Sequence, residues 1–208
     1  MDSPAAQRWD ERYSTTEYVF GTAANDFLAA VVEQLPKGRA LCLGEGEGRN
    51  AVFLANRGYA VTAVDVSSAG LQKAERLAAE RGTPIETTVA DLAEYAIEPQ
   101  SWDVVVLIFV HLPPELRQRV HRAAVEGLKA GGALVLEAFT PERRELRSGG
   151  PPDDELLMRL EVLREELQGL ELEVAQEVRR EIHEGTRHNG IKAVVQVLGF
   201  RTAERPRV

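Results

Sequence analysis

The segment Ala40–Asn50, ALCLGEGEGRN, joins an apolar run directly to three glycines with the spacing GxGxG, namely Gly44, Gly46 and Gly48. Glycine adopts backbone conformations that other residues avoid, and it lets the main chain approach a ligand closely. A helical pattern follows from about Asn50, so the N–H groups of that helix would point at whatever binds to the turn. The segment therefore predicts a strand, a glycine turn and a helix that cradle a nucleotide cofactor, although ordinary strand-to-helix corners are also rich in glycine.

Acidic residues follow the next two β-rich runs. Asp65 closes the apolar part of YAVTAVDVSS, at the distance beyond the glycines where nucleotide-binding folds place a carboxylate for the ribose hydroxyls. Asp91 follows the run Ile85–Ala90. The carboxyl ends of parallel strands share one edge of a sheet, and that edge binds ligands in open α/β folds. We expect both acids at this edge, with a helix cap or a solvated charge as the alternative for Asp65.

The glycine spacing also separates two cofactors. A dinucleotide fingerprint, GxGxxG, would need a glycine at position 49, where this chain has Arg49. The pattern closes early, at Gly48. The spacing therefore argues against NAD.

Apolar runs and helical segments alternate along the chain, which predicts an α/β, Rossmann-like, doubly wound fold. The uninterrupted apolar run Val104–Val110 is typical of a central parallel strand, and five β/α repeats imply helices on both faces of the sheet. After Asp153 an amphipathic helix precedes two alternating stretches that should pair as an antiparallel hairpin, which makes the sheet mostly parallel and seven-stranded. Helices are expected over residues 26–34, 50–58, 68–82, 114–130 and 153–168, and the later strands over 85–90, 104–110, 133–139, 170–182 and 191–200.

Composition limits the classes of protein and partner. The 208 residues and 44% apolar content fit one domain, residues 25–208, after an N-terminal arm or lid, residues 1–24. A net charge of −8 without a basic stripe argues against a nucleic-acid partner. Cys42 is the single cysteine, so an intramolecular disulfide is impossible and a reduced, cytoplasmic setting is expected. We expect a soluble protein without a membrane partner, because no apolar run approaches the ~20 residues needed to cross a bilayer.

The ordered motifs LCLGEGEGRN, AVDVS, VADL and LKAGGALVLEAF resemble those of class I S-adenosylmethionine-dependent methyltransferases. The opening WDERYSTTEYVFGTAANDFL, the GEGEGRN turn and the late EGTRHNG resemble the tellurite-resistance and thiopurine type of small-molecule methyltransferase. The resemblance implies S-adenosyl-L-methionine as cofactor and S-adenosyl-L-homocysteine as product. The residues expected to bind the cofactor are Gly44, Glu45, Gly46, Gly48, Arg49, Asn50, Asp65, Val66, Ser67, Asp91, Leu92 and Phe109.

One position departs from the family pattern. The family usually has an acid two residues before the first glycine, where it helps to hold the amino group of the cofactor, and this chain has Cys42 there. Glu45, inside the turn, either supplies a replacement carboxylate or points to solvent.

Methyl transfer from a sulfonium needs alignment more than covalent help from the protein. An anionic acceptor needs no base, whereas an amine or alcohol must lose a proton. His111 follows the central strand and His188 lies in the EGTRHNG turn, so both are candidate catalytic residues, with a capping or a solvated histidine as the alternatives. No metal site is expected. The candidate substrate-binding residues are Tyr13 and Tyr18 of the arm, Glu137 in the LEAF segment, where a buried ion pair is the alternative, and Arg187 beside His188.

Three functions are compatible with these patterns. The favoured one is methyl transfer to a small-molecule nucleophile such as a thiol or a chalcogen oxyanion. A methyltransferase acting on a protein or other macromolecule is the second, and a non-catalytic module that binds an adenosyl cofactor is the third, for which the Cys42 substitution is the positive hint. A monomer or weak homodimer is expected.

Overall fold

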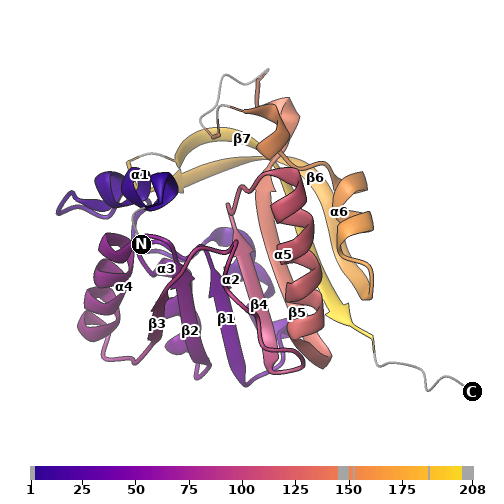
Figure 1. Cartoon of the computed structure of the whole chain (residues 1–208), viewed down its shortest axis with the longest axis horizontal. Coiled ribbons are helices and arrows are strands. Elements are labelled where there is room, and N and C mark those ends of the chain that lie inside the picture. Colours follow the sequence, from indigo (N-terminus) through magenta and orange to yellow (C-terminus); the bar gives the residue numbers. More distant parts are fainter. Residues whose placement is uncertain (1–2, 145–149, 152, 187, 203–208) are drawn as a thin grey trace, which may run out of the picture.

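A seven-stranded sheet forms the centre of the computed structural model, which describes residues 3–144, 150–151, 153–186 and 188–202 (Figure 1). The strand order is β3-β2-β1-β4-β5-β7-β6, with β1 to β5 parallel and β7 antiparallel to both of its neighbours. The predicted fold class is confirmed, including the C-terminal hairpin at one side of the sheet. The strands are β1 (Arg39–Leu43), β2 (Ala60–Asp65), β3 (Glu86–Val89), β4 (Trp102–Ile108), β5 (Leu128–Phe139), β6 (Leu170–Glu184) and β7 (His188–Arg201).

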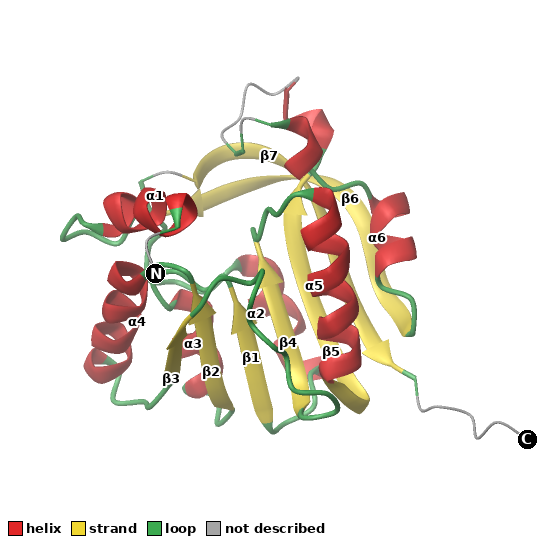
Figure 2. Cartoon of the chain, viewed as in Figure 1, coloured by secondary structure: helices red, strands yellow, loops and turns green. Residues whose placement is uncertain are grey.

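Helices cover both faces of the sheet (Figure 2). Apolar side chains of α2, α3 and α4 pack on one face, and those of α5 and α6 pack on the other. These two layers leave the carboxyl edge of the parallel strands open for a site. The helices are α1 (Pro4–Tyr13), α2 (Asp26–Val31), which continues as a 3-10 turn (Val32–Gln34), α3 (Arg49–Ala55), α4 (Ser68–Glu80), α5 (Pro114–Gly127) and α6 (Leu160–Glu166).

Two predicted N-caps are present. The Asn25 side chain accepts a hydrogen bond from the Leu28 N–H at 3.1 Å, and the Ser67 hydroxyl accepts one from the Gly70 N–H at 3.0 Å. Each contact satisfies an N–H group that the first turn of a helix leaves without an intrahelical partner. The starts of α2 and α4 therefore follow from local sequence.

The boundary between α5 and β5 differs from the prediction. The helix ends at Gly127 and the strand begins at Leu128, so the Gly131–Gly132 pair lies inside β5 instead of closing the helix. The register with β4 shifts between Trp102 and Val104, and Gly131 has a φ of +76°. The glycines thus form an irregularity within the strand, a role that glycine also favours.

The predicted helix over residues 153–168 is wrong in its first half. A 3-10 turn (Asp154–Leu156) is followed by extended backbone, and α6 starts only at Leu160. The Met158 N–H donates to the carbonyl oxygen of Phe139 at 2.9 Å, and Met158 is almost fully buried. Packing against the end of β5 overrides the helical spacing of the leucines.

The N-terminal arm contains α1, which lies beyond the carboxyl edge of the sheet next to α4 and the end of the β6–β7 hairpin (Figure 1). Asp10 on α1 accepts hydrogen bonds from the Ser67 hydroxyl and from the Ala69 N–H at the start of α4. In the part of the chain that the structure describes, no helix is both long enough and apolar enough to cross a bilayer.

Candidate active site

The glycine turn between β1 and α3 has the backbone that its sequence predicts. Gly44, Gly46 and Gly48 all have positive φ angles, of +61°, +62° and +88°. A Cβ atom at Gly48 would lie 2.5 Å from the Cβ of Ala74 on α4, which is too close for any side chain. The turn is therefore fixed both by its dihedral angles and by the approach of α4.

Glu45 points inward, toward the start of α3. Its Oε1 atom accepts hydrogen bonds from the N–H groups of Asn50 and Ala51 at 2.8 and 2.9 Å. Burial raises the pKa of Glu45 to about 7, against the opposing effect of these two hydrogen bonds. The carboxyl group thus caps α3, and Cys42 lies fully buried beside it.

Glu47, also inside the turn, anchors the N-terminal arm. Its carboxylate accepts hydrogen bonds from the Val19 and Phe20 N–H groups at 3.1 and 3.2 Å. Lys73 on α4 donates to Glu47 at 2.7 Å and to the carbonyl oxygen of Glu17 at 2.6 Å. Both side chains of this pair are 2% exposed. We call Glu47 and Lys73 the arm anchor. This pair was not predicted, and its only signal in the sequence is an acid between two glycines of the turn.

Asp65 and Asp91 lie at the carboxyl edge, as predicted. Asp65 accepts hydrogen bonds from the Gly46 and Ser67 N–H groups, both at 2.8 Å. Burial raises the pKa of Asp65 to about 6 although both of these bonds favour the ionised form. Asp91 is partly exposed and accepts a hydrogen bond from the Ala93 N–H at 2.8 Å. The neighbouring partly exposed residues of the predicted cofactor set are Gly44, Val66, Leu92 and Phe109.

Three other members of that set are buried and hold structural contacts. Asn50 accepts a hydrogen bond from the Asn25 N–H at 2.9 Å, and Ser67 caps α4. Arg49 donates to Glu184 at 2.8 Å across the domain, and both side chains are largely buried. The structure therefore gives each of them a role in holding the turn, the arm or the hairpin.

The two tyrosines of the arm differ in position. Tyr13 is buried, and its hydroxyl lies 2.5 Å from where a Cβ at Gly46 would stand. Its ring stacks on that of Trp9 with centroids 5.5 Å apart. The Tyr18 hydroxyl donates to the carbonyl oxygen of Lys73, so this side chain faces α4. The structure thus places Tyr13, and not Tyr18, against the glycine turn.

Aromatic rings from four separate segments meet beside the carboxyl edge. His188 lies 4.6 Å from Phe20, 4.9 Å from Phe109 and 5.6 Å from Phe139 between ring centroids. His111 is nearly parallel to Phe139, with centroids 5.5 Å apart. Phe109 has a φ of +56°, a strained angle for a residue with a large side chain, and such strain often marks functional sites. We call these five residues the aromatic wall.

His111 has one satisfied and one unsatisfied ring nitrogen. Nδ1 lies 2.9 Å from the carbonyl oxygen of Leu156, which only accepts, so Nδ1 carries the hydrogen. Burial lowers the pKa of His111 to about 4. The neutral ring therefore keeps a lone pair on Nε2, and this buried atom has no hydrogen-bond partner among the described residues.

His188 lies next to the carboxylate of Glu184, which was not among the predicted site residues. Its Nδ1 is 3.3 Å from Glu184, at the far end of β6. Burial alone would raise the pKa of Glu184, but the hydrogen bond with His188 and the charge of Arg49 lower it to about 2. Glu184 is thus ionised at neutral pH and can only accept, which places the hydrogen of a neutral His188 on Nδ1.

Glu137 is fully buried within a polar network. It accepts hydrogen bonds from Arg180 at 2.7 and 2.8 Å, from Asn25 at 2.5 Å and from Gln196 at 2.9 Å. This is the buried ion pair that the sequence left as the alternative. Arg187, the remaining residue predicted for substrate binding, lies outside the described residues.

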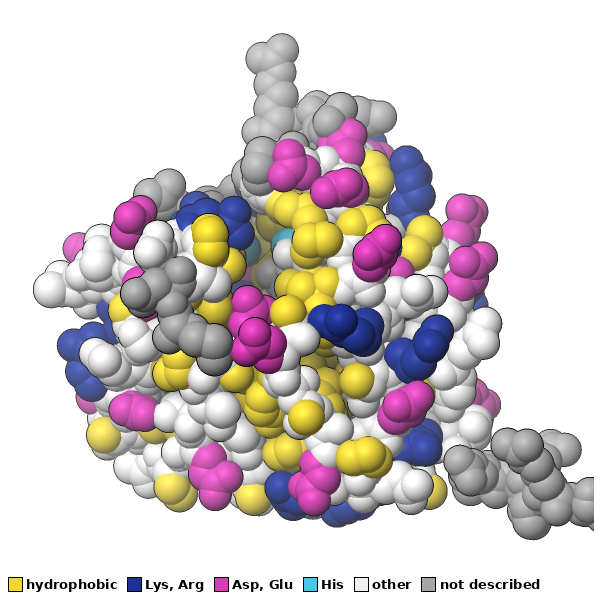
Figure 3. All heavy atoms as spheres, in the orientation of Figure 1, with side chains coloured by type: hydrophobic (Ala, Val, Ile, Leu, Met, Phe, Trp, Pro, Cys, Tyr) yellow, Lys and Arg dark blue, Asp and Glu magenta, His cyan; other side chains and the backbone are white. Residues whose placement is uncertain are grey.

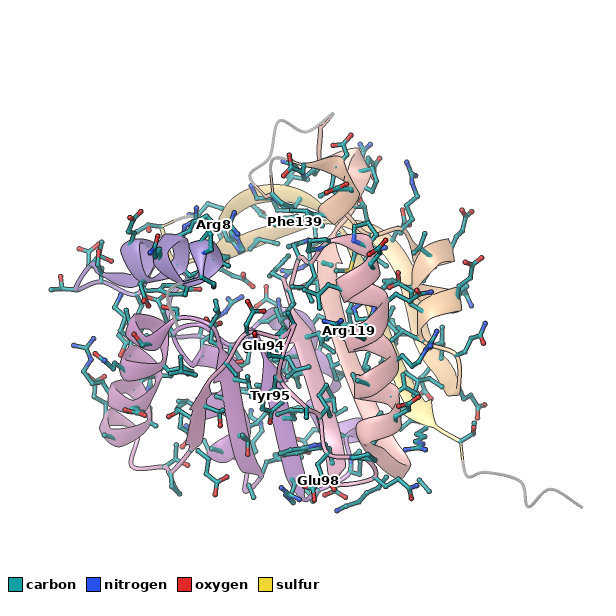
Figure 4. All side chains as sticks on the ribbon, in the orientation of Figure 1. Arg8, Glu94, Tyr95, Glu98, Arg119 and Phe139 are labelled. Atoms are coloured by element: carbon teal, nitrogen blue, oxygen red, sulfur yellow. The ribbon has the colours of Figure 1, made fainter. Side chains whose placement is uncertain are left out.

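The surface is hollowed between α1 and the upper end of β5, with hydrophobic side chains gathered at the rim and histidine visible inside (Figure 3). Arg8 on α1, Phe139 at the end of β5 and Glu94 after β3 surround this region (Figure 4). The hollow therefore lies where the carboxyl edge, the arm and the aromatic wall converge.

A family model described as a methyltransferase domain matches residues 40–132, from β1 to the glycine pair of β5. The 2-heptyl-1-hydroxyquinolin-4(1H)-one methyltransferase of Mycobacteroides abscessus is 26% identical over 136 residues. This stretch of the chain is therefore similar to methyltransferase domains. That alignment covers 64% of this chain and 57% of its relative, so the chain spans little more than half the length of that relative.

Solved structures share the methyltransferase fold over nearly the whole chain. One such structure is described for the conversion of a disulfide bond into a thioacetal group during echinomycin biosynthesis. The alignment covers 97% of this chain and 93% of that one, with a TM-score of 0.77 and 19% identity. TehB from Haemophilus influenzae covers 96% of this chain and is covered to 67%, with a TM-score of 0.69 and 20% identity. These likenesses extend through the arm and the hairpin, which lie outside the region matched by the family model.

Proposed function

We propose that this protein transfers the methyl group of S-adenosylmethionine to a small-molecule nucleophile by in-line displacement. One observation carries the proposal: Asp65 accepts a hydrogen bond from the glycine turn, and Tyr13 joins that turn to the aromatic wall. The Tyr13 hydroxyl lies against Gly46, and the Tyr13 ring is 6.2 Å from that of Phe20. A cofactor cradle and a wall for a second molecule therefore lie side by side.

The residues at this edge fit the cofactor. The Gly46 and Ser67 N–H groups fix the Asp65 carboxylate, whose remaining lone pairs suit the ribose hydroxyls. The partly exposed Gly44 and Asp91 lie along the same edge and would hold other parts of the cofactor. When bound, S-adenosylmethionine supplies a methyl group that its sulfonium sulfur already activates. The chain contributes alignment and exclusion of water, and alignment alone can supply roughly 7–11 kcal/mol of barrier reduction.

We infer that residues 1–24 act as a lid on the domain of residues 25–208. The arm anchor holds the backbone of Val19 and Phe20, and the Thr186 N–H of the hairpin donates to the Val19 carbonyl at 3.0 Å. Phe20 belongs to the aromatic wall. The arm thus supplies part of the surface that a small acceptor would touch, which supports a small molecule over a macromolecule as acceptor.

The finer proposal is that the acceptor is a soft nucleophile, a thiol or a chalcogen oxyanion. A thiolate or an oxyanion already carries a free lone pair and requires no base. One structural neighbour is described for the conversion of a disulfide bond into a thioacetal group, and TehB shares the fold, which supports this chemistry by similarity.

The test begins with calorimetric titration of the protein with S-adenosylmethionine, S-adenosylhomocysteine and NAD. We expect micromolar binding of the first two and none of NAD. A panel of thiols, oxyanions and hydroxylated ring compounds then tests turnover by release of S-adenosylhomocysteine. Binding of NAD alone would refute the proposal, and binding of S-adenosylmethionine without turnover on any acceptor would favour the non-catalytic module.

A further inference from the structure

The aromatic wall defines the acceptor more narrowly than the proposed function does. We propose that the acceptor is a planar aromatic molecule with an ionisable hydrogen on oxygen or sulfur, and that His188, positioned by Glu184, removes this hydrogen from acceptors that are not already ionised. The inference rests on the proposed methyl transfer. It assigns roles to two residues at opposite ends of the hairpin turn, Glu184 and His188.

The partly exposed rings of the wall offer a surface for a flat ring, and Phe139 is buried behind them. Five planar side chains, Phe20, Phe109, Phe139, His111 and His188, lie with neighbouring centroids between 4.6 and 5.6 Å apart. Aromatic partners pack on such rings in stacked or edge-on arrangements that aliphatic groups cannot form. A selenium or tellurium oxyanion has no ring to place there, so of the two soft acceptors proposed above the wall favours the thiol.

The pair Glu184–His188 has the arrangement of an oriented base. The ionised Glu184 accepts the hydrogen of His188 Nδ1, which leaves the lone pair of Nε2 for the acceptor. The carboxylate also stabilises the positive charge that the ring acquires when it takes a proton. Arg49 on α3 and Arg180 on β6 share Glu184, and His111 is the other titratable group of the wall.

His111 has a different role in the same wall. Its Nδ1–H is held by the Leu156 carbonyl, and its buried Nε2 has no hydrogen-bond partner among the described residues. A buried acceptor atom without a partner is unfavourable, so the site is suited to a ligand that brings a donor. His111 therefore orients the acceptor's hydroxyl or a ring N–H without taking its proton at neutral pH.

The reaction balances without any further reactant. His188 Nε2 takes the proton from the acceptor's O–H or S–H bond, and the electron pair of that bond stays on the oxygen or sulfur. This pair forms the new bond to the methyl carbon as the carbon leaves the sulfonium sulfur, which keeps the C–S pair and becomes neutral. His188 then returns its proton to water.

The first experiment measures acceptor binding without turnover, by calorimetry with protein saturated in S-adenosylhomocysteine. The probes are 2-naphthol, naphthalene-2-thiol and the saturated analogue decahydro-2-naphthol, together with tellurite and selenite. We expect the two aromatic probes to bind at least tenfold more tightly than the saturated alcohol, and the oxyanions not to bind. Equal affinity of the saturated and aromatic alcohols, or tighter binding of an oxyanion, would overturn the proposal.

The second experiment separates the base from the wall. In slightly alkaline buffer naphthalene-2-thiol is largely ionised, whereas 2-naphthol must lose its proton. We expect His188→Gln to lower kcat with 2-naphthol about a hundredfold, a typical loss for a general base, while kcat with the thiol changes less than threefold. Glu184→Gln should lower kcat with 2-naphthol about tenfold and alter its pH profile, again sparing the thiol. Retained turnover of the thiol shows that each variant is folded.

The matched control is His183→Gln. His183 lies on the same strand as Glu184, but its side chain is 72% exposed and faces Glu181, so we expect no change with either acceptor. Equal losses with 2-naphthol and the thiol in His188→Gln would refute the role of His188 as a base. Absence of S-adenosylmethionine binding in the unmodified protein would instead refute the proposed function, so the two failures are distinguishable.

Discussion

The arm anchor gives the sharpest test of how the turn and the arm are held together. Lys73→Met removes the cation and leaves the Glu47 carboxylate buried with two backbone N–H groups. Glu47→Gln keeps a hydrogen-bond acceptor for those groups but leaves the Lys73 ammonium with the carbonyl oxygen of Glu17. Each single change therefore leaves one buried charge without its ionic partner, because both side chains are only 2% exposed.

The magnitude follows from this burial. Removing one partner of a buried ion pair costs about 3–5 kcal/mol, because the remaining charge is uncompensated. We expect Lys73→Met to lie in this range and Glu47→Gln at or below its lower end. The double variant contains no stranded charge, so its loss should be smaller than the sum of the single losses by about 1–3 kcal/mol.

The assay is urea denaturation followed by circular dichroism and by tryptophan fluorescence, with the free energy of unfolding obtained for all four proteins. Trp9 lies on α1, so its fluorescence also reports on the arm. As a control, Arg39 and Glu98 form a pair with side chains 48% and 65% exposed, and a cycle at that pair should show coupling of no more than about 1 kcal/mol. Additive losses at Glu47 and Lys73 would refute the account of the anchor given above.

Three further predictions address the turn and the arm. Gly48→Ala should lower the free energy of unfolding, measured by urea denaturation, by at least about 2 kcal/mol, because of backbone strain at φ +88° and a clash with α4. The control is Gly58→Ala, where φ is +85° and no atom lies within 4 Å of the added Cβ, so only the strain should appear. The pKa of Glu45 is raised to about 7 from an ordinary 4.5, so between these pH values the folded state binds more protons than the unfolded state. The free energy of unfolding should therefore fall by about 3 kcal/mol as pH rises from 4.5 to 7. Glu45→Gln should remove this part of the pH dependence, and an unchanged pH dependence would contradict the prediction. Deleting residues 1–24 should leave a folded protein by circular dichroism with sharply lower turnover, and full turnover would exclude a lid.

Features that depend on neighbouring residues were predictable from the sequence. The caps at Asn25 and Ser67, the glycine turn and the alternating strands of the hairpin all follow from patterns a few residues long. The same logic failed where a distant contact decided the outcome. Residues 153–168 have helical spacing, but the bond from Met158 to Phe139 holds part of that segment extended.

The positions of the glycine turn and of Asp65 were predictable from the sequence, whereas the contacts of Glu184 and Tyr18 were not. The turn and Asp65 carry a spacing that nucleotide-binding folds share, so local sequence indicates them. Glu184 has no such local signal, because its role depends on two contacts. One is with Arg49, 135 residues earlier in the chain, and the other is with His188 across a turn. Tyr18 shows the converse: an aromatic residue in the arm suggested a substrate contact, yet its hydroxyl bonds to the backbone of α4.

The contact between the arm and the hairpin turn has a consequence for how this protein can change. Phe20, Phe139 and His188 of the aromatic wall come from outside residues 40–132, the stretch that the family model recognises, whereas the glycine turn, Asp65 and Asp91 come from inside it. Under the proposed function, three of the five residues of the wall thus come from the flanking segments, whereas Phe109, His111 and the proposed cofactor residues come from the matched stretch. Because the two flanking segments meet through Val19 and Thr186, they form one exchangeable unit. Grafting both together from a relative should transplant acceptor choice, whereas grafting either alone would leave half a wall.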